Sequence, residues 1–372
     1  QVRGGMGFFA GQIPYVWLSN AFHNDGLRSV TQTCLGRWYE EPRPTWPVPS
    51  FDPGGLPTSC YEPLPGRSPF QELRNVVVFD PGFKYPQDLK FSAVVDQELT
   101  DRVTGSLGFL FNKALNQVGL KELNVEGSSP GLDTVALAGE QRSYYGPMTD
   151  DFQHVLLVTN EGEDWAASLT AELRGMVTDQ LAFQFGYTLA RSWDRFSLTN
   201  SDMLSNFGSN PSEANINKPP LTVSNFDRPH KVVASVFGSP FPGLPDTELS
   251  VLYTGQSGLP FSYVYGGDVN GDGYAGLGGS FDLYNDLLYI PRTLSEAPLS
   301  FVTQGVLASA VEADDCLARH QGRTLRRNAC RSPWENRLDL RLAHTLRFGA
   351  GTSVRLEADL INVLNLVNSD WG

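Results

Sequence analysis

The chain has 372 residues, with 28 Lys and Arg against 41 Asp and Glu, so its net charge is −13 at neutral pH. A charge this negative argues against a protein that binds nucleic-acid phosphates. Hydrophobic residues make up 41% of the chain and charged residues 19%, a composition too apolar for a disordered protein. No run approaches 18 apolar residues, which excludes a membrane-spanning helix but not the strands of a membrane barrel.

Apolar and polar residues alternate along much of the chain, a period of two that predicts strands with one apolar face. In 179–191 the apolar set is expected to face lipid and Gln184 and Thr188 to face a lumen; that apolar set includes Phe183, Phe185, Tyr187 and Leu189. We predict nine strands, in chain order 2–10, 88–98, 102–113, 152–176, 179–191, 229–238, 246–256, 337–348 and 354–360.

The connections between these strands alternate strictly between short and long. The short ones are 99–101, 177–178, 239–245 and 349–351, and the long ones are 11–87, 114–151, 194–228 and 257–334. In an antiparallel meander, this order places all short turns at one end and all long, structureless loops at the other. Such loops count against a compact soluble domain and are typical of outer-membrane barrels. We therefore predict an all-β, antiparallel transmembrane β-barrel with long extracellular loops.

Several motifs, spread over most of the chain and in the expected order, resemble the barrel portion of TonB-dependent outer-membrane receptors of the Oar-like branch. They are Arg3–Gly7, Pro14–Ala21, Asn225–His230, Gly267–Gly273, Asn285–Pro291, Arg327–Arg331 and Asn362–Asn365. The resemblance implies a 22-strand barrel, an N-terminal plug and ligand uptake driven by TonB. We expect residues 1–372 to be a partial barrel domain truncated at both ends, with TonB engaged through an N-terminal region outside it.

The segment Asp268-Val269-Asn270-Gly271-Asp272-Gly273 reads D-x-N-x-D-G, the opening of a calcium loop. Gly279 stands where an EF-hand has its twelfth-position Glu, so Asp286 or Asp282 would have to supply the missing carboxylate. A polar turn that binds no metal is the alternative. The sequence therefore predicts Ca²⁺ as the one candidate cofactor, with that alternative open.

The four cysteines form two local pairs inside long loops, and we predict the disulfides Cys34–Cys60 and Cys316–Cys330. A zinc site is the alternative, but no C-x₂-C pair exists. The second pair encloses a basic cluster that is a candidate contact for an anion such as lipopolysaccharide phosphate or an acidic ligand; it consists of Arg319, Arg323, Arg326 and Arg327. Salt bridges to acidic loop residues such as Asp314 and Asp315 are the alternative role. Helix-like spacing predicts a short helix within 300–313.

No H-E-x-x-H, G-x-S-x-G or P-loop motif occurs, so we do not expect an enzyme. The predicted function is an outer-membrane receptor barrel that takes up an unidentified extracellular ligand and contacts membrane lipid and lipopolysaccharide. Two alternatives stay open. One is an outer-membrane adhesin or structural barrel without active uptake, and the other is a soluble, calcium-dependent, carbohydrate-binding β-sandwich, because periodicity alone does not separate a lumen-facing polar surface from a solvent-facing one.

Overall fold

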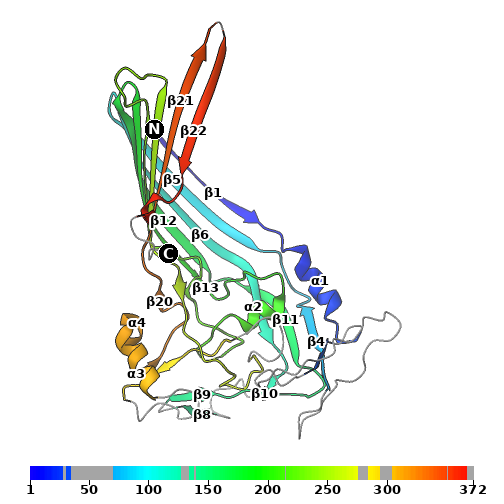
Figure 1. Cartoon of the computed structure of the whole chain (residues 1–372). Helices are drawn as coiled ribbons and strands as arrows, with labels where there is room; N and C mark the ends of the chain where they lie inside the picture. Colours follow the sequence, from blue (N-terminus) through cyan, green and yellow to red (C-terminus); the bar gives the residue numbers. More distant parts are fainter. Residues whose placement is uncertain are drawn as a thin grey trace, which may run out of the picture.

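Figure 1 shows the computed structural model of the chain, in which one long, curved sheet stands on a folded mass of shorter elements. The structure describes residues 1–27, 31–34, 70–126, 134–137, 140–213, 215–274, 284–293, 304–349 and 351–366. For residues 31–34, 70–73, 134–137, 140–143 and 304–308 it describes the backbone alone.

The curved sheet, here called the wall, is an antiparallel meander in which each wall strand pairs with the wall strands that precede and follow it in sequence. This confirms the all-β antiparallel prediction. In the described part of the chain no second sheet packs against the wall, so the β-sandwich hypothesis is wrong. The wall strands are β1 (Val2–Ala10), β5 (Gln87–Thr100), β6 (Val103–Glu122), β12 (Trp165–Thr178), β13 (Leu181–Asp194), β15 (His230–Gly238), β16 (Thr247–Gln256), β21 (Glu335–Phe348) and β22 (Thr352–Leu360).

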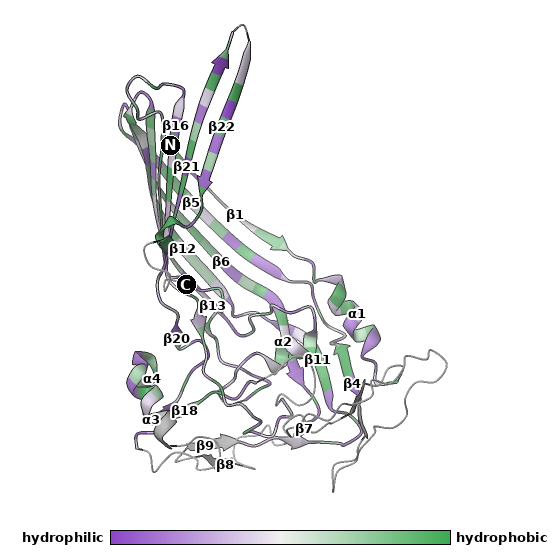
Figure 2. Ribbon diagram, viewed as in Figure 1, coloured by the Kyte–Doolittle hydropathy of each residue, from purple (hydrophilic) through white to green (hydrophobic). Residues whose placement is uncertain are grey.

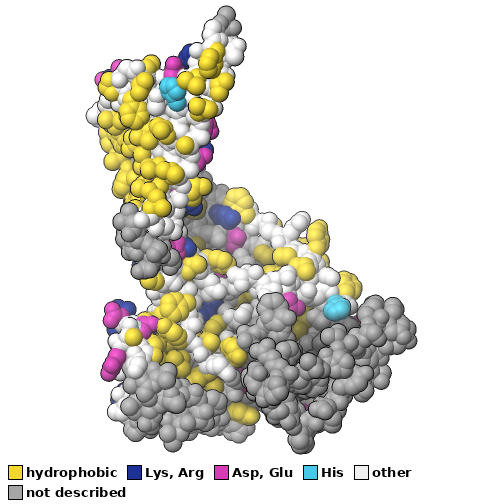
Figure 3. All heavy atoms as spheres, viewed as in Figure 1, with side chains coloured by type: hydrophobic (Ala, Val, Ile, Leu, Met, Phe, Trp, Pro, Cys, Tyr) yellow, Lys and Arg dark blue, Asp and Glu magenta, His cyan; other side chains and the backbone are white. Residues whose placement is uncertain are grey.

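The pairing register gives the wall one apolar and one polar face. Phe185 lies opposite Leu173 on one side and Ala234 on the other, and the same row continues to Tyr253 and Leu338. Figure 2 shows the resulting alternation of hydrophobic and hydrophilic residues along the strands, and Figure 3 shows hydrophobic side chains gathered over the wall. Phe185 is 43% exposed, so this apolar face is uncovered by protein.

The polar face carries charged pairs that cross from strand to strand. Arg341 binds Asp359 at 2.6 Å, Arg355 binds Glu248 at 2.8 Å, and Gln184 donates to Glu172. The two faces therefore separate lipid-compatible from water-compatible side chains, as the sequence pattern predicts.

The four short connections lie together at the far end of the wall from the folded mass (Figure 1). They are tight at residues 101–102 and 179–180, and longer at 239–246 and 349–351. Arg102 and Asp179 join two neighbouring turns through a 2.7 Å ion pair. The predicted short connections are thus confirmed, with boundaries that shift by one or two residues.

Two strand boundaries differ from the prediction. The predicted single strand 152–176 is wrong, because it is divided into β11 (His154–Glu161) and β12 by residues 162–164. Strand β6 runs on to Glu122 rather than ending at residue 113. Leu115 is an extra residue there, because Gln87 pairs with Asn116 while Asp88 pairs with Ala114. This bulge reverses the alternation of apolar and polar residues, so a search for a period of two misses the second half of the strand.

The described residues of the segments 11–86, 114–164, 194–229 and 257–334 gather at the other end of the wall and are here called the cap (Figure 1). The prediction that these loops are structureless is wrong, whereas the helix expected within 300–313 is confirmed as α3. Besides β11, the cap elements are α1 (Tyr15–His23), β2 (Thr31–Cys34), β3 (Phe70–Leu73), β4 (Asn75–Phe79), β7 (Val125–Glu126), β8 (Thr134–Leu137), β9 (Glu140–Ser143), β10 (Gly146–Pro147), α2 (Met203–Gly208), β14 (Thr222–Val223), β17 (Pro260–Phe261), β18 (Tyr289–Ile290), α3 (Gln304–Ala313), α4 (Asp315–Arg319), β19 (Arg323–Thr324) and β20 (Cys330–Arg331).

A hydrophobic core holds the cap together. Its buried side chains come from all four cap segments and include Trp17, Val77, Leu120, Leu156, Phe207 and Tyr274. Strand β11 extends β6 antiparallel and carries β4 in parallel on its other side. A short 3₁₀ turn, η2 (Val363–Leu366), follows β22. Among the described residues no helix is long and apolar enough to cross a membrane.

Candidate ligand-recognition site in the cap

A cavity of about 340 Å³ lies where α1, β6 and the 194–229 segment meet. Trp17 and Phe196 form apolar walls, while Gln117 and Asp164 are polar. The Trp17 indole donates to the Asn200 carbonyl, which fixes α1 against the neighbouring segment. An apolar cavity with a few placed polar groups is the usual form of a small-molecule site.

The carboxyl group of Asp164 gives this cavity its chemical character. Burial raises the pKa of Asp164 to about 6, and the nearby Asp194 carboxylate acts in the same direction. The Arg195 backbone N–H donates to Asp164 and partly opposes that shift. Such a carboxyl suits a ligand that donates hydrogen bonds or carries positive charge.

A second polar group, at the centre of the cap, joins two of its segments, 114–164 and 257–334. Glu122, at the end of β6, accepts a hydrogen bond from the Tyr274 hydroxyl at 3.0 Å and contacts His154 Nδ1 at 3.1 Å. The His154 and Tyr274 rings stack 4.1 Å apart. Burial raises the pKa of Glu122, but hydrogen bonds from His154, Val155 and Asn124 outweigh burial and hold it below its usual value.

The predicted calcium loop is present as a tight turn. Asp268 accepts hydrogen bonds from the backbone N–H groups of Gly271, Asp272 and Gly273. Gly273 has φ +85°, a left-handed backbone conformation that glycine adopts without strain and that allows the sharp turn. Asp286 reaches the loop and accepts from the Val269 and Asn270 N–H groups.

Asp272 is the most perturbed carboxyl of this loop. Burial raises its pKa to about 7, and the Asp268 and Asp286 carboxylates add to the shift. In the described part of the chain no three His, Cys, Asp or Glu side chains converge on one point as metal ligands. Asp282 lies outside the described residues. The calcium assignment stays a prediction.

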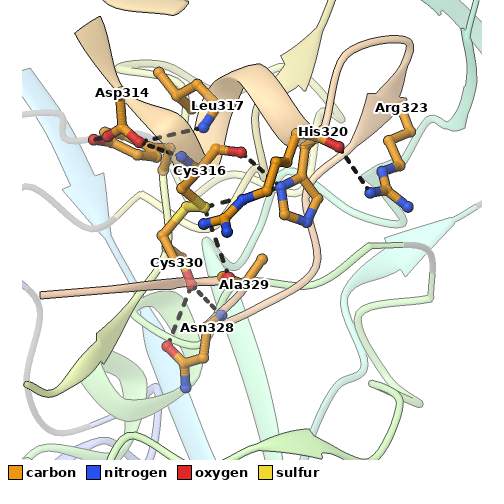
Figure 4. The surroundings of a disulfide bond; sticks show 11 residues. Asp314, Cys316, Leu317, His320, Arg323, Asn328, Ala329 and Cys330 are labelled. Atoms are coloured by element: carbon orange, nitrogen blue, oxygen red, sulfur yellow. Dashed lines mark hydrogen bonds between the residues drawn. A yellow bond between two sulfur atoms is a disulfide. The ribbon is translucent and has the colours of Figure 1, made fainter. Parts of the chain in front are cut away.

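The predicted disulfide Cys316–Cys330 is present, with the two Cα atoms 5.7 Å apart (Figure 4). Both cysteines are buried. Asp314 caps α4 beside the bond by accepting from the Cys316 and Leu317 N–H groups. The other predicted pair is not described, since Cys60 and the side chain of Cys34 lie outside the described residues.

The four arginines of the basic cluster have different surroundings. Arg327 is buried and forms a 2.6 Å ion pair with Asp194, together with hydrogen bonds to Thr222 and Asn210. This geometry gives Arg327 a structural role and replaces the expected partners Asp314 and Asp315 with Asp194. Arg319, Arg323 and Arg326 are exposed, so only these three are placed to meet an anion.

Two of the sequence motifs meet next to the disulfide. Asn328, with φ +60°, donates to Asn225 at 2.7 Å and to the Val223 carbonyl at 2.7 Å. Arg331 binds the buried Asp227 at 2.6 Å. The segments Arg327–Arg331 and Asn225–His230 therefore hold the 257–334 segment on the long-loop ends of β13 and β15. These contacts were not predicted from the sequence, because the partners lie about a hundred residues apart.

The alternating faces, the turns gathered at one end and the cap at the other are the features of an outer-membrane barrel. A family model described as "Outer membrane beta barrel domain" matches residues 1–370. The chain belongs to this outer membrane beta-barrel family. Its location is therefore the bacterial outer membrane, with the apolar face of the wall toward lipid.

Among solved structures, the outer membrane transporter YddB from Escherichia coli is similar to this chain at 11% sequence identity and a TM-score of 0.43. The match covers 80% of this chain and 31% of the transporter, so the chain spans less than a third of that protein's length. A search of curated protein sequences returned no match.

Proposed function

We propose that this chain forms part of a TonB-dependent receptor that binds a ligand from outside the cell at its cap and passes it inward along the polar face of the wall. The observation that carries the proposal is the shared core of the cap. Side chains from all four cap segments pack together, so the cavity between Trp17, Phe196 and Asp164 has fixed walls. A preformed cavity favours recognition of a small ligand.

Dependence on TonB is proposed from the resemblance of the motifs, and it is tested on the full-length protein in its own membrane. A photo-crosslinking residue placed in the region that precedes Gln1 should capture TonB. Capture that disappears when that region is deleted supports the proposal. A full-length protein that captures no TonB, yet still mediates surface attachment, would instead be the adhesin or structural barrel.

Contact with lipopolysaccharide phosphate or an acidic ligand is proposed only for the exposed arginines. Arg319, Arg323 and Arg326 are exposed on the cap surface, whereas Arg327 is buried in its ion pair with Asp194. Replacing all three by Gln should weaken binding of purified receptor to lipopolysaccharide at least tenfold at low salt. Unchanged binding in the triple variant would remove this role.

A further inference from the structure

Two parts of the 257–334 segment meet in a buried polar group. One is the turn at residues 268–274, and the other is the pair Asn285 and Asp286. Asp272 is 3% exposed, Asp286 1% and Asn285 3%, so water has little access to them. Buried carboxylates are normally paired with a cation or coordinate a metal.

The contacts divide the turn residues into two sets. The carboxylate oxygens of Asp268 accept hydrogen bonds from three backbone N–H groups, and these bonds shape the turn. Asp272 accepts a backbone N–H, that of Tyr274, at its Oδ1, while its Oδ2 accepts from the side-chain amides of Asn285 at 2.6 Å and Asn270 at 3.2 Å, which could rearrange around an ion. Among the described residues no Lys, Arg or His forms an ion pair with Asp272.

An independent observation points to a missing ligand. The Oδ1 atom of Asn285 is buried and has no hydrogen-bond partner, although the amide of the same side chain touches Asp272. A buried acceptor without a donor costs free energy, and native structures rarely retain one that no ion or water contacts. A cation beside Asp272 would satisfy this oxygen and balance the charge of the Asp272 carboxylate.

We propose that Asn270, Asp272, Asn285 and Asp286 bind a Ca²⁺ ion inside the cap. All four side chains offer oxygen, and hard divalent cations such as Ca²⁺ prefer carboxylate and amide oxygens. The donor set differs from an EF-hand, because Asn285 and Asp286, which follow the turn in the same 257–334 segment, replace the ligand that the twelfth position lacks. With two carboxylates, the site is expected to bind Ca²⁺ with a dissociation constant of about 10⁻⁴–10⁻³ M, as in extracellular modules.

The position of the ion gives it a mechanical role. The Asn270 carbonyl accepts the Tyr145 N–H at 2.6 Å, and Tyr274 reaches Glu122. An ion that fixes the turn therefore fixes its contacts with residues from the 114–164 segment. The site is independent of the proposed uptake function, since a barrel of any role could use it.

The test is the thermal unfolding of the purified full-length protein in detergent micelles, with CaCl₂ titrated from zero to 10 mM after treatment with a chelator. Wild-type protein should unfold at a higher temperature as Ca²⁺ rises, with half of the effect near about 1 mM. Terbium luminescence, excited through a nearby tyrosine such as Tyr274, should report occupancy directly.

Matched variants locate the ion. Asp272→Asn and Asn285→Ala should each weaken the apparent Ca²⁺ affinity at least tenfold, whereas Asn285→Asp should strengthen it by adding a carboxylate. Asp314→Asn removes a carboxylate that caps α4 outside the site and should keep the full response. A wild-type protein that shows no Ca²⁺ response, or a response that survives in both Asp272→Asn and Asn285→Ala, would overturn the proposal.

Discussion

Arg327 shows how a side chain that looks like a surface cation can be structural. Its side chain is 3% exposed and binds Asp194, Thr222 and Asn210 at the long-loop end of β13. Arg326, its neighbour in sequence, is 78% exposed and lies 3.9 Å from Glu213. The sequence predicts a basic cluster but not this division, because burial depends on residues more than a hundred positions away.

Arg327→Ala should lower the free energy of unfolding of the cap by about 3–5 kcal/mol, because it leaves Asp194 buried without its partner. Arg326→Ala should change stability by less than about 0.5 kcal/mol, since exposed pairs contribute little. Limited proteolysis of the cap in membranes, followed over temperature, measures both. Equal protease resistance in the two variants would contradict the structural role of Arg327.

Glu122 links the stability of the cap to pH. Its pKa in the folded protein lies below the usual value near 4.5, so folding favours the charged form. The stability from Glu122 is therefore fully present above about pH 4.5 and is lost as the pH falls through the lower, folded-state pKa.

The stability of the wild-type cap should accordingly fall more steeply in acid than that of Glu122→Gln. The variant should be less stable than wild type at neutral pH, and its stability should change less with pH below pH 4.5. Thermal unfolding monitored from pH 3 to pH 7 measures the two slopes. Parallel curves for the two proteins would show that Glu122 does not contribute to the acid sensitivity.

Within single elements, strand β13 shows what a period of two can predict. Its alternation is regular, and the structure places Phe185 on the apolar face and Gln184 on the polar face, as expected. Strand β6 is regular only as far as the bulge at Leu115. Beyond the bulge, the apolar residues of the strand occupy even instead of odd positions. Regular strands were therefore predicted, and the bulged extension was not.

Phe185→Arg should destabilise the barrel in lipid by about 2–4 kcal/mol if Phe185 lies near the bilayer midplane, and less if it lies closer to the interface. Gln184→Arg should be tolerated, because the new cation would lie beside Glu172 on the polar face. Urea unfolding in vesicles compares the two variants. A similar cost for both would mean that the faces are not lipid and lumen.

The disulfides are features of individual cap segments. Non-reducing peptide mapping should recover Cys316–Cys330, as in the structure, and Cys34–Cys60, which stays a prediction. Loss of the first bond in Cys316→Ser with Cys330→Ser should cost about 3 kcal/mol through the added freedom of the unfolded segment. A Cys34–Cys316 link would show a different arrangement of the cap.

At the scale of the whole molecule, the wall was predictable and the cap was not. Each wall strand can be predicted from its own sequence, because its apolar face is formed by residues two positions apart. The cap core joins Trp17, Leu120, Phe207 and Tyr274, whose packing no local pattern encodes. The calcium motif was recognisable as a turn for the same reason, while Asn285 could be placed beside it only by the fold.

The parallel pairing of β4 with β11 has a consequence for biogenesis. His154 pairs with Asn75 across 79 residues of chain, and the cap core closes only when Tyr274 arrives near Glu122. Hairpins such as β12–β13 need only neighbouring residues and can form early, whereas contacts of large sequence separation form late and slowly. A nascent chain that ends before Tyr274 should thus present paired strands but an unfinished, protease-sensitive cap.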